Sequence, residues 1–256
     1  MKFSIIMPTY NRAESYLKRA IDSVINQTYR NWELIIIDNN SIDNTKELIK
    51  SYEHPQIKMY TINNNGNIAK SRNLGINNSR GDYLAFLDSD DYWKEDKLKV
   101  CADFLNNNNE YVGICHSEDW NSKDNKFIKK YGPEKNFTFK RLLAKGNCIS
   151  LSAMVVKKSN IVDVNNFSEN TEFITAEDYD LWVKLAEKNN KIGFIEKSLG
   201  VYQIHSNSGS SNILKNTHAV INVIKKYLKN NDEMLNIALS NCWLNTGKRF
   251  YINNKK

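Results

Sequence analysis

The sequence lacks the features of a disulfide-bonded or membrane-spanning protein. Its 256 residues include four cysteines, with no Cys-x-x-Cys pair and no regular spacing. This usage argues against a disulfide scaffold or a zinc module and fits a reducing compartment. No apolar run approaches the roughly 18 residues of a spanning helix, and Met1 leads into a predicted strand instead of a signal peptide. We therefore expect a cytoplasmic protein whose contact with any membrane is peripheral.

The chain also lacks a nucleic-acid-binding motif, although it is cationic. Lys and Arg number 36 against 29 Asp and Glu, which gives a formal net charge of +7. Such a surface can meet nucleic acid, an anionic membrane or a phosphorylated substrate. Because no helix-turn-helix, zinc module or aromatic RNA-binding strand is visible, we expect no nucleic-acid partner.

Short apolar segments alternate with segments of helical spacing through the first half of the chain. Apolar runs of about five residues between turn residues favour strands, and apolar residues three or four positions apart favour helices. Their alternation predicts an α/β fold with a mainly parallel central sheet flanked by helices. The expected strands are 3–7, 33–37, 57–62, 83–87 and 112–116, and the expected helices are 13–26, 43–52, 68–77 and 95–106, with Ser41 or Asp43 capping the second.

The pattern loosens after the last of these strands. Residues 120–135 are polar and rich in lysine, a helix is expected near 137–144, and the run 149–156 is apolar enough to be buried. From Leu214 the spacing is helical again, with lysines beside an apolar face. A second helix is expected to follow it up to Phe250.

Three acidic clusters stand in a fixed order along the chain. Residues 38–43 and 88–91 each follow a predicted strand, and Glu177-Asp178-Tyr179-Asp180 begins a helical pattern. The carboxyl ends of parallel strands form the edge where open α/β sheets bind ligands. Carboxylates gathered there repel one another unless a cation joins them, and Asp-x-Asp suits a hard ion that also holds phosphates. The clusters predict a metal and diphosphate site.

These segments together resemble the inverting, metal-dependent glycosyltransferases of family 2. The likeness covers about residues 3–206 and implies the nucleotide-diphospho-sugar (GT-A) fold, which is Rossmann-like. The segments that carry it are Ser4 to Arg12, Gln27-Thr28-Tyr29, Trp32-Glu33-Leu34, Asp38 to Thr45, Gly66 to Gly75, Gly81 to Asp91 and Glu177 to Trp182.

The resemblance also suggests a domain division. We expect a GT-A domain over residues 1–207, whose nucleotide-sugar-binding half ends at about residue 115. The acceptor-binding half then covers about residues 116–207. Residues 208–256 are expected to form a small C-terminal helical appendage.

The resemblance implies a nucleoside pocket near the amino terminus. Pro8, Thr9, Tyr10 and the carboxylate of Asp38 would line it, since a carboxylate pairs well with an N–H of uracil or with ribose hydroxyls. Asn39 departs from many relatives, which carry a second Asp at this place. Its amide still offers a donor and an acceptor, so the preference for uridine is an open question at this point.

The resemblance implies a metal and diphosphate site at the second acidic cluster. Asp88-Ser89-Asp90 resembles the Asp-x-Asp signature, with Asp90 coordinating the metal and Asp88 binding ribose or a metal-bound water. Arg72 would reach toward the base or the diphosphate, which a guanidinium binds well. His205 matches a histidine that some relatives use to touch the metal or the diphosphate. The implied cofactor is Mn²⁺ or Mg²⁺.

The third cluster resembles the position of the general base in the family. Inversion in one displacement needs a carboxylate opposite the leaving group to take the proton of the acceptor hydroxyl. Asp178 is the first choice for that role and Glu177 the second. No covalent nucleophile is required.

The resulting prediction is a metal-dependent inverting glycosyltransferase. The donor would be a nucleotide sugar, a UDP-hexose or UDP-N-acetylhexosamine. The acceptor would be a hydroxyl of a growing glycan, part of a lipid-linked bacterial surface polysaccharide. With the positive charge, this predicts peripheral contact with an anionic membrane at the cytoplasmic face of the inner membrane. Neither the sugar, the linkage nor the oligomeric state is readable from the sequence.

Two other functions stay open at the level of the sequence. A sugar nucleotidyltransferase would need a glycine-rich loop after the first strand, and residues 8–12 contain no glycine. A non-catalytic nucleotide-sugar-binding subunit of a glycan assembly complex is mildly favoured by Asn39. The intact Asp90 and Asp178 weigh against it.

Each candidate residue also has an ordinary structural interpretation. Asp and Asn at strand ends often form turns and helix caps, and Glu177 and Asp178 could be first-turn acids favoured by the helix dipole. Arg72 could pair with an acid, and His205 could be a hydrogen-bonded surface or core residue. The basic helix after Leu214 could pack its apolar side on the main domain.

Overall fold

The five predicted strands are all present in the protein, and four further strands join them. The structure is a computed structural model and describes residues 1–13, 16–122, 125–205 and 212–253. Its strands are β1 (Phe3–Thr9), β2 (Trp32–Asp38), β3 (Ile57–Thr61), β4 (Tyr83–Phe86), β5 (Tyr92–Trp93), β6 (Gly113–Asn121), β7 (Lys126–Lys129), β8 (Met154–Lys157) and β9 (Ile192–Gln203).

Helices connect these strands and close the chain. The predicted second helix begins at Thr45, later than expected; Asn44 is its cap residue, and neither Ser41 nor Asp43 holds that position. The helices are α1 (Leu17–Ile25), α2 (Thr45–Lys50), α3 (Ile68–Asn78), α4 (Lys97–Asn107), α5 (Phe139–Lys145), α6 (Lys158–Asp163), α7 (Glu177–Glu187), α8 (Ile213–Leu228) and α9 (Asp232–Asn253).

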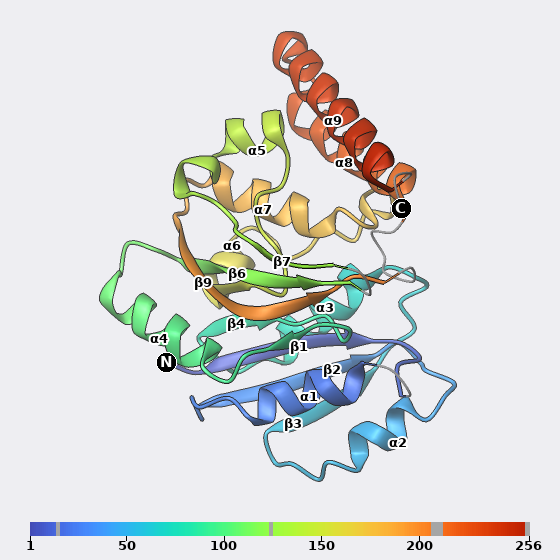
Figure 1. The fold of residues 1–256 in the computed structure, drawn as a ribbon, viewed down its shortest axis with the longest axis vertical. Helices are drawn as coiled ribbons and strands as arrows, with labels where there is room; N and C mark the ends of the chain where they lie inside the picture. Colours follow the sequence, from blue (N-terminus) through green and yellow to red (C-terminus); the bar gives the residue numbers. More distant parts are fainter. Residues whose placement is uncertain (14–15, 123–124, 206–211, 254–256) are drawn as a thin grey trace.

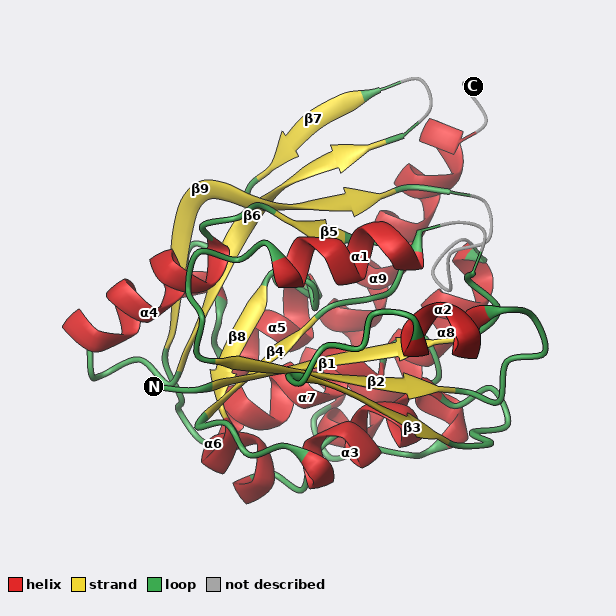
Figure 2. Cartoon of the chain, turned by 90° about the horizontal axis from the view of Figure 1, so that it is seen from below, coloured by secondary structure: helices red, strands yellow, loops and turns green. Residues whose placement is uncertain are grey.

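One curved sheet organises the molecule in the order β3-β2-β1-β4-β8-β6-β9-β5, with β7 added beside β6. The strands β3, β2, β1 and β4 are parallel, as predicted. Beyond β4 the sheet is mixed, because β8 runs antiparallel to both β4 and β6. Figure 2 shows the twist from β3 through β4 to β6, β9 and β7.

Two hydrophobic clusters lie on opposite faces of this sheet. In β2, Leu34 and Ile36 join the cluster under α1 and α4, whereas Ile35 and Ile37 join the cluster under α3, α5 and α7. The alternation follows from the two-residue period of a strand. Strands buried on both faces read as continuous apolar runs, which is why these segments were recognisable in the sequence.

Four strands were not predicted. β8 lies in the apolar run 149–156, which the sequence indicated only as buried. β5 has two residues, β7 is fully exposed and rich in lysine, and β9 mixes charged and apolar residues over twelve positions. None of them shows a clear two-residue alternation of apolar residues. β1 also continues through Pro8 to Thr9, where the sequence suggested a stop.

The C-terminal helices form a hairpin at the end of the molecule farthest from α1 and α2 (Figure 1). The apolar face of α8 is buried: Val223, Ile224 and Leu228 belong to the same cluster as the second face of the sheet. The expected boundary between residues 207 and 208 lies outside the described residues. Within the described residues, no helix has both the length and the apolar character required to cross a bilayer.

Candidate active site

A pocket of about 890 Å³ opens where β1 and β4 end. This is the sheet edge at which the sequence predicts a ligand site. Asp38 and His205 are the two predicted residues that are not part of its wall. The wall includes Pro8, Thr9, Tyr10, Arg12, Asn39, Arg72, Asp88, Ser89, Asp90, Asn147, Ser152, Thr175, Glu177, Asp178, Tyr202 and Lys215.

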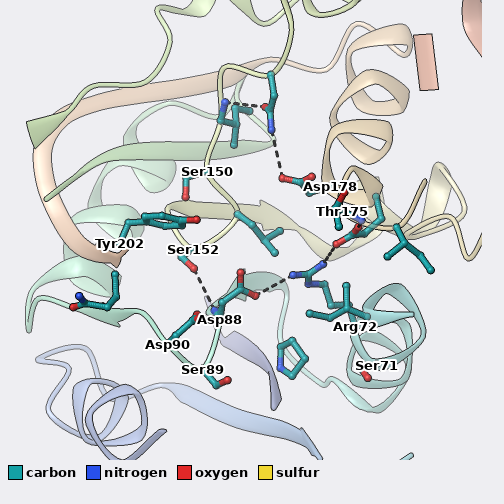
Figure 3. A pocket seen from close by; sticks show the side chains of 18 of the residues that line it. Ser71, Arg72, Asp88, Ser89, Asp90, Ser150, Ser152, Thr175, Asp178 and Tyr202 are labelled. Carbon is teal, nitrogen blue, oxygen red and sulfur yellow. Dashed lines mark hydrogen bonds and ion pairs between the residues drawn. The ribbon is translucent and has the colours of Figure 1, made fainter. Parts of the chain in front are cut away.

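The loop after β4 is held in place by residues distant in the chain. The hydroxyl of Ser152 accepts from the backbone N–H of Asp88 at 3.2 Å and donates to the carboxylate of Asp91 at 2.6 Å. The other oxygen of Asp91 accepts from the N–H of Gln203 at 2.8 Å. Asp91 is buried, and this burial raises the pKa of its carboxyl well above the ordinary value. Asp91 therefore anchors the loop, which leaves Asp88, Ser89 and Asp90 facing the pocket (Figure 3).

Asp90 is surrounded by cationic or polar partners. Its Oδ2 lies 2.8 Å from Nε2 of His205 and 3.6 Å from the guanidinium of Arg12. The ring of His205 in turn stacks on Tyr16 with centroids 5.2 Å apart. The resemblance implies that both residues contact the metal or the diphosphate, and the structure places them within hydrogen-bonding distance of each other. Their proximity agrees with a shared ligand and also with an ordinary hydrogen bond.

The donor set fits a divalent cation that is completed by substrate. In the described part of the chain, no three His, Cys, Asp or Glu side chains form a ready metal cage. Mg²⁺ and similar hard ions are commonly held by one or two carboxylates together with substrate phosphates, which is what Asp88 and Asp90 offer. Burial raises the pKa of Asp88, and the nearby charge of Asp90 adds to this effect although Arg72 opposes it. A further cation would relieve that repulsion.

Arg72 joins the two halves of the pocket. It lies on α3, its side chain is almost fully buried, and it donates to Oδ1 of Asp88 at 3.0 Å and to Oε1 of Glu177 at 2.5 Å. Figure 3 shows the side chains of Arg72 and Asp88 pointing toward each other. The pairing with acids was one of the interpretations left open by the sequence, but it occurs in the pocket wall and not across the surface.

Glu177 and Asp178 have different surroundings although they are adjacent. Both oxygens of Glu177 are bound, one by Arg72 and the other by the N–H of Thr175 at 2.8 Å. Asp178 is partly exposed to the pocket and accepts from Nδ2 of Asn147 at 3.4 Å and from the N–H of Tyr179 at 2.7 Å. Burial, and next the charge of Glu177, raise the pKa of Asp178 to about 7. Of these two residues, Asp178 is the one that combines access with a pKa suited to proton transfer near neutrality.

The predicted nucleoside end is built from β1 and the loop after β2. Thr9 is buried, and its hydroxyl has no hydrogen-bond partner among the described residues. Tyr10 is half exposed, and Asn39 accepts from the N–H of Asn64 at 2.8 Å. Asp38 is fully buried beneath the wall and accepts from the N–H of Ser41 at 3.1 Å. Asn39 therefore faces the pocket, whereas Asp38 supports the loop from below.

Several residues of the site carry no recognisable signal in the sequence. Ser152 and Asn147 lie in an irregular segment before β8, and Tyr202 lies on β9, which was not predicted. Serine and asparagine are common in loops. Only the folded chain shows that Ser152 holds the Asp88 loop and that Asn147 reaches Asp178.

Comparison with known proteins shows the family. The sequence model of the family described as glycosyl transferase family 2 matches residues 4–160, more than half of the chain. The chain belongs to glycosyltransferase family 2. It is 31% identical over 231 residues to the UDP-Glc:alpha-D-GlcNAc-diphosphoundecaprenol beta-1,3-glucosyltransferase WfgD of Escherichia coli, covering 89% of this chain and 87% of that one.

Solved structures agree on the fold. TarS of S. aureus in complex with UDP-GlcNAc is 21% identical, with a TM-score of 0.72 over 92% of this chain and 70% of that one. The mannosyltransferase PcManGT of Pyrobaculum calidifontis, in complex with GDP-Man and Mn²⁺, is 14% identical, with a TM-score of 0.69 over 95% and 73% of the two chains. This family 2 member is thus a glycosyltransferase with the GT-A fold, and the nucleotidyltransferase and non-catalytic alternatives are set aside.

Proposed function

We propose that this family 2 enzyme transfers a hexose or N-acetylhexosamine from a UDP donor, with inversion, to a hydroxyl of a lipid-linked glycan. The observation that carries the proposal is the placement of Asp178. A carboxyl with a pKa of about 7 lies on the wall of the same pocket as Asp88 and Asp90. That arrangement suits a base at one end of a displacement and a diphosphate leaving group at the other.

The nucleoside end supports a nucleotide donor. The orphaned hydroxyl of Thr9, the exposed ring of Tyr10 and the amide of Asn39 offer hydrogen-bonding groups and an aromatic face to a base and a ribose. We propose uridine because WfgD is named for UDP-Glc and TarS was solved with UDP-GlcNAc. Asp38 would contribute by fixing the loop that carries Asn39.

The metal site would consist of Asp90, Asp88 and His205. A bound Mn²⁺ or Mg²⁺ would supply Lewis-acid stabilisation of the diphosphate leaving group. Arg12 and Arg72 already place positive charge beside Asp90 and Asp88, so they would hold these carboxylates in position and attract the anionic donor. His205, which lies against Asp90, would supply the nitrogen ligand.

Asp178 would act on the acceptor. Its carboxylate takes the proton from the attacking hydroxyl, and the hydrogen bond from Asn147 keeps one oxygen oriented into the pocket. Glu177 cannot share this task while both of its oxygens are bound. Its proposed role is to hold Arg72 and, by its charge, to keep the pKa of Asp178 high.

The acceptor is proposed to be a lipid-linked diphosphate glycan, since WfgD is named for such a substrate. A peripheral position on the cytoplasmic face of the inner membrane would then follow. The sequence allowed the helix after Leu214 to pack its apolar side on the main domain, and the apolar side of α8 is buried. It is α9 that exposes Ile237, Leu244 and Tyr251 at seven-residue intervals, with Trp243 and Phe250 beside them.

Sedimentation with anionic phospholipid vesicles tests the membrane part. Leu244→Glu should weaken binding, whereas Asn245→Glu at the neighbouring exposed position adds the same charge beside the row formed by Ile237, Leu244 and Tyr251. Equal binding by both variants would remove α9 from the proposal.

A thermal-shift screen followed by a transfer assay tests the reaction. UDP-sugars are compared with other nucleotide sugars, with and without Mn²⁺, because a ligand that binds only the folded state raises its melting temperature. The donor with the largest shift is then assayed with a synthetic GlcNAc-diphospho-lipid. Asp90→Ala should abolish metal-dependent transfer. Full activity of that variant would refute the proposal. A screen in which none of the UDP-sugars raises the melting temperature would refute it as well.

A further inference from the structure

The C-terminal hairpin contributes Lys215 to the pocket wall, and the neighbouring side chain of Asn216 bonds to the loop before α7. Asn216 is the fourth residue of α8, and its Nδ2 donates to the backbone carbonyl of Thr175 at 2.8 Å. Its Oδ1 accepts from the guanidinium of Arg249 on α9 at 2.7 Å. The amide is therefore oriented from one side by α9 and bound on the other side to the loop before α7.

Thr175 is the residue that needs such support. Its φ is +83°, in a region that β-branched residues rarely adopt because the side chain crowds the backbone. Strained backbone of this kind persists only where surrounding contacts fix it. The contact from Asn216 holds the carbonyl of Thr175, and the N–H of the same residue donates to Glu177.

The strained residue stands directly before the catalytic segment. Thr175 contributes to the pocket wall, Glu177 binds Arg72, and Asp178 follows in the chain. Figure 3 shows Thr175 and Asp178 beside each other at the start of α7, on the side of the pocket that faces Arg72. A change in the backbone at Thr175 would thus move both the partner of Arg72 and the proposed base.

We propose that Asn216 is a positioning residue for catalysis, and that through it the C-terminal hairpin fixes the conformation of Thr175 and hence the placement of Glu177 and Asp178. This inference rests on the proposed role of Asp178. Asn216 touches neither donor nor acceptor in this scheme. It acts only through the loop.

The hairpin offers a matched control. Asn241 of α9 makes the same kind of bond, from Nδ2 to the carbonyl of Ala144 on α5 at 2.9 Å. It also fastens the hairpin to the main domain, but Ala144 is not part of the pocket wall. Loss of docking would affect Asn216→Ala and Asn241→Ala alike, whereas loss of positioning would affect Asn216→Ala alone.

The test measures kcat, KM for the UDP donor and melting temperature for the full-length variants. Asn216→Ala should lower kcat roughly 10- to 100-fold, since small displacements of catalytic groups have effects of that size. KM for the donor should stay within about twofold, because ground-state donor contacts are unchanged. Asn216→Asp should behave in the same way, since a carboxylate cannot donate to the Thr175 carbonyl. Asn241→Ala should keep the kcat of the wild type.

A double-mutant cycle with Thr175→Gly separates positioning from other effects. Glycine adopts positive φ without steric cost, so the loop then depends less on Asn216. The double variant should turn over faster than Asn216→Ala, which makes the two effects non-additive. Additive effects, a kcat for Asn216→Ala equal to that of the wild type, or an equal loss in Asn241→Ala would each overturn the inference.

Asp178→Asn is assayed in parallel. If the wild type transfers sugar and Asp178→Asn does not, a normal Asn216→Ala variant overturns only the positioning role. If Asp178→Asn is fully active, the proposed function fails, and the inference fails with it.

Discussion

The guanidinium of Arg72 lies 2.5 Å from the carboxylate of Glu177, although 105 positions separate the two residues in the chain. The same guanidinium binds Asp88 at 3.0 Å. Arg72 thereby connects the loop proposed to hold the metal with the start of the helix that carries the proposed base. The proposed metal-binding loop and the helix of the proposed base are thus both linked to one buried guanidinium.

Arg72→Met should lower both stability and activity. Removing one partner of a buried ion pair leaves the other charge unpaired, which costs about 3 to 5 kcal/mol of unfolding free energy. Arg72→Lys should recover part of the stability but not the activity, because an ammonium cannot reproduce the planar two-sided geometry of a guanidinium. Urea unfolding and kcat measure the two effects. Arg80→Met, at an exposed site, is the control, and equal unfolding midpoints for both Met variants would contradict the prediction.

Transfer should increase with pH through about 7, since Asp178 must be deprotonated to act as the base and burial raises its pKa to about 7. Asp178→Asn should lower kcat roughly 10²- to 10⁴-fold while the thermal shift with the donor persists. Full kcat in this variant would exclude the role of Asp178.

Asp178→Asn should make the protein more stable than the wild type at pH 8. The pKa of Asp178 is higher in the folded state than the ordinary 3.8, so folding takes up a proton and stability falls as the pH rises from about 4 to 7. Asparagine carries no charge and escapes this loss. Melting temperatures at pH 5 and pH 8 should show the advantage of the variant growing with pH. An advantage that is equal at both values would contradict the raised pKa.

His205→Ala should raise the Mn²⁺ concentration that gives half-maximal transfer. His205 lies against Asp90, and loss of a group that holds or orients a metal commonly weakens binding about tenfold or more. His218→Ala, on the exposed side of α8, is the control. A normal Mn²⁺ titration for His205→Ala would assign the histidine to an ordinary hydrogen bond with Asp90.

Lys97 should make stability increase with pH in an alkaline range. It is fully buried, donates to the carbonyl of Ser152 at 2.8 Å and lies 3.5 Å above the ring of Trp93. Burial lowers its pKa from 10.5 to about 7, so the unfolded chain binds the proton more tightly and unfolding becomes less favourable as the pH rises from 7 to 10.

Lys97→Met should remove this increase in stability between pH 7 and pH 10. The difference in unfolding free energy between wild type and variant should shift in favour of the wild type from pH 7 to pH 10, as measured by urea titration. Lys99→Met, on the exposed face of the same helix, is the matched control. A constant difference for Lys97→Met would show that the ammonium does not titrate in this window.

The parallel half of the fold was predictable because its strands are buried on both faces. Runs such as Leu34-Ile35-Ile36-Ile37 then stand out in the sequence. β9 could not be recognised in this way, since its middle carries Glu196 and Lys197 at the surface. Pairing with both β6 and β5 defines it as a strand, and such distant pairings leave no local pattern.

The site was predictable where a residue type has few alternative uses. Asp88, Asp90 and Asp178 all face the pocket that the sequence suggested, although their chemical roles stay predictions. Neighbouring residues at a strand end point in opposite directions, and the sequence does not show which of Asp38 and Asn39 faces the pocket. Ser152 and Asn216 are ordinary polar residues in the sequence. Their hydrogen bonds to distant segments are visible only in the folded chain.

The hydrogen bond from the Gln203 N–H to Asp91 spans 112 positions, and this has a consequence for synthesis on the ribosome. A nascent chain that ends before β8 and β9 exposes the free edge of β4 and leaves the buried carboxylate of Asp91 without its donors. Residues 1–115 should therefore not reach their final shape while the ribosome is still translating the second half. Expression of residues 1–115 alone should give an aggregating fragment, so the two halves are one unit in biogenesis even if they divide the substrates between them.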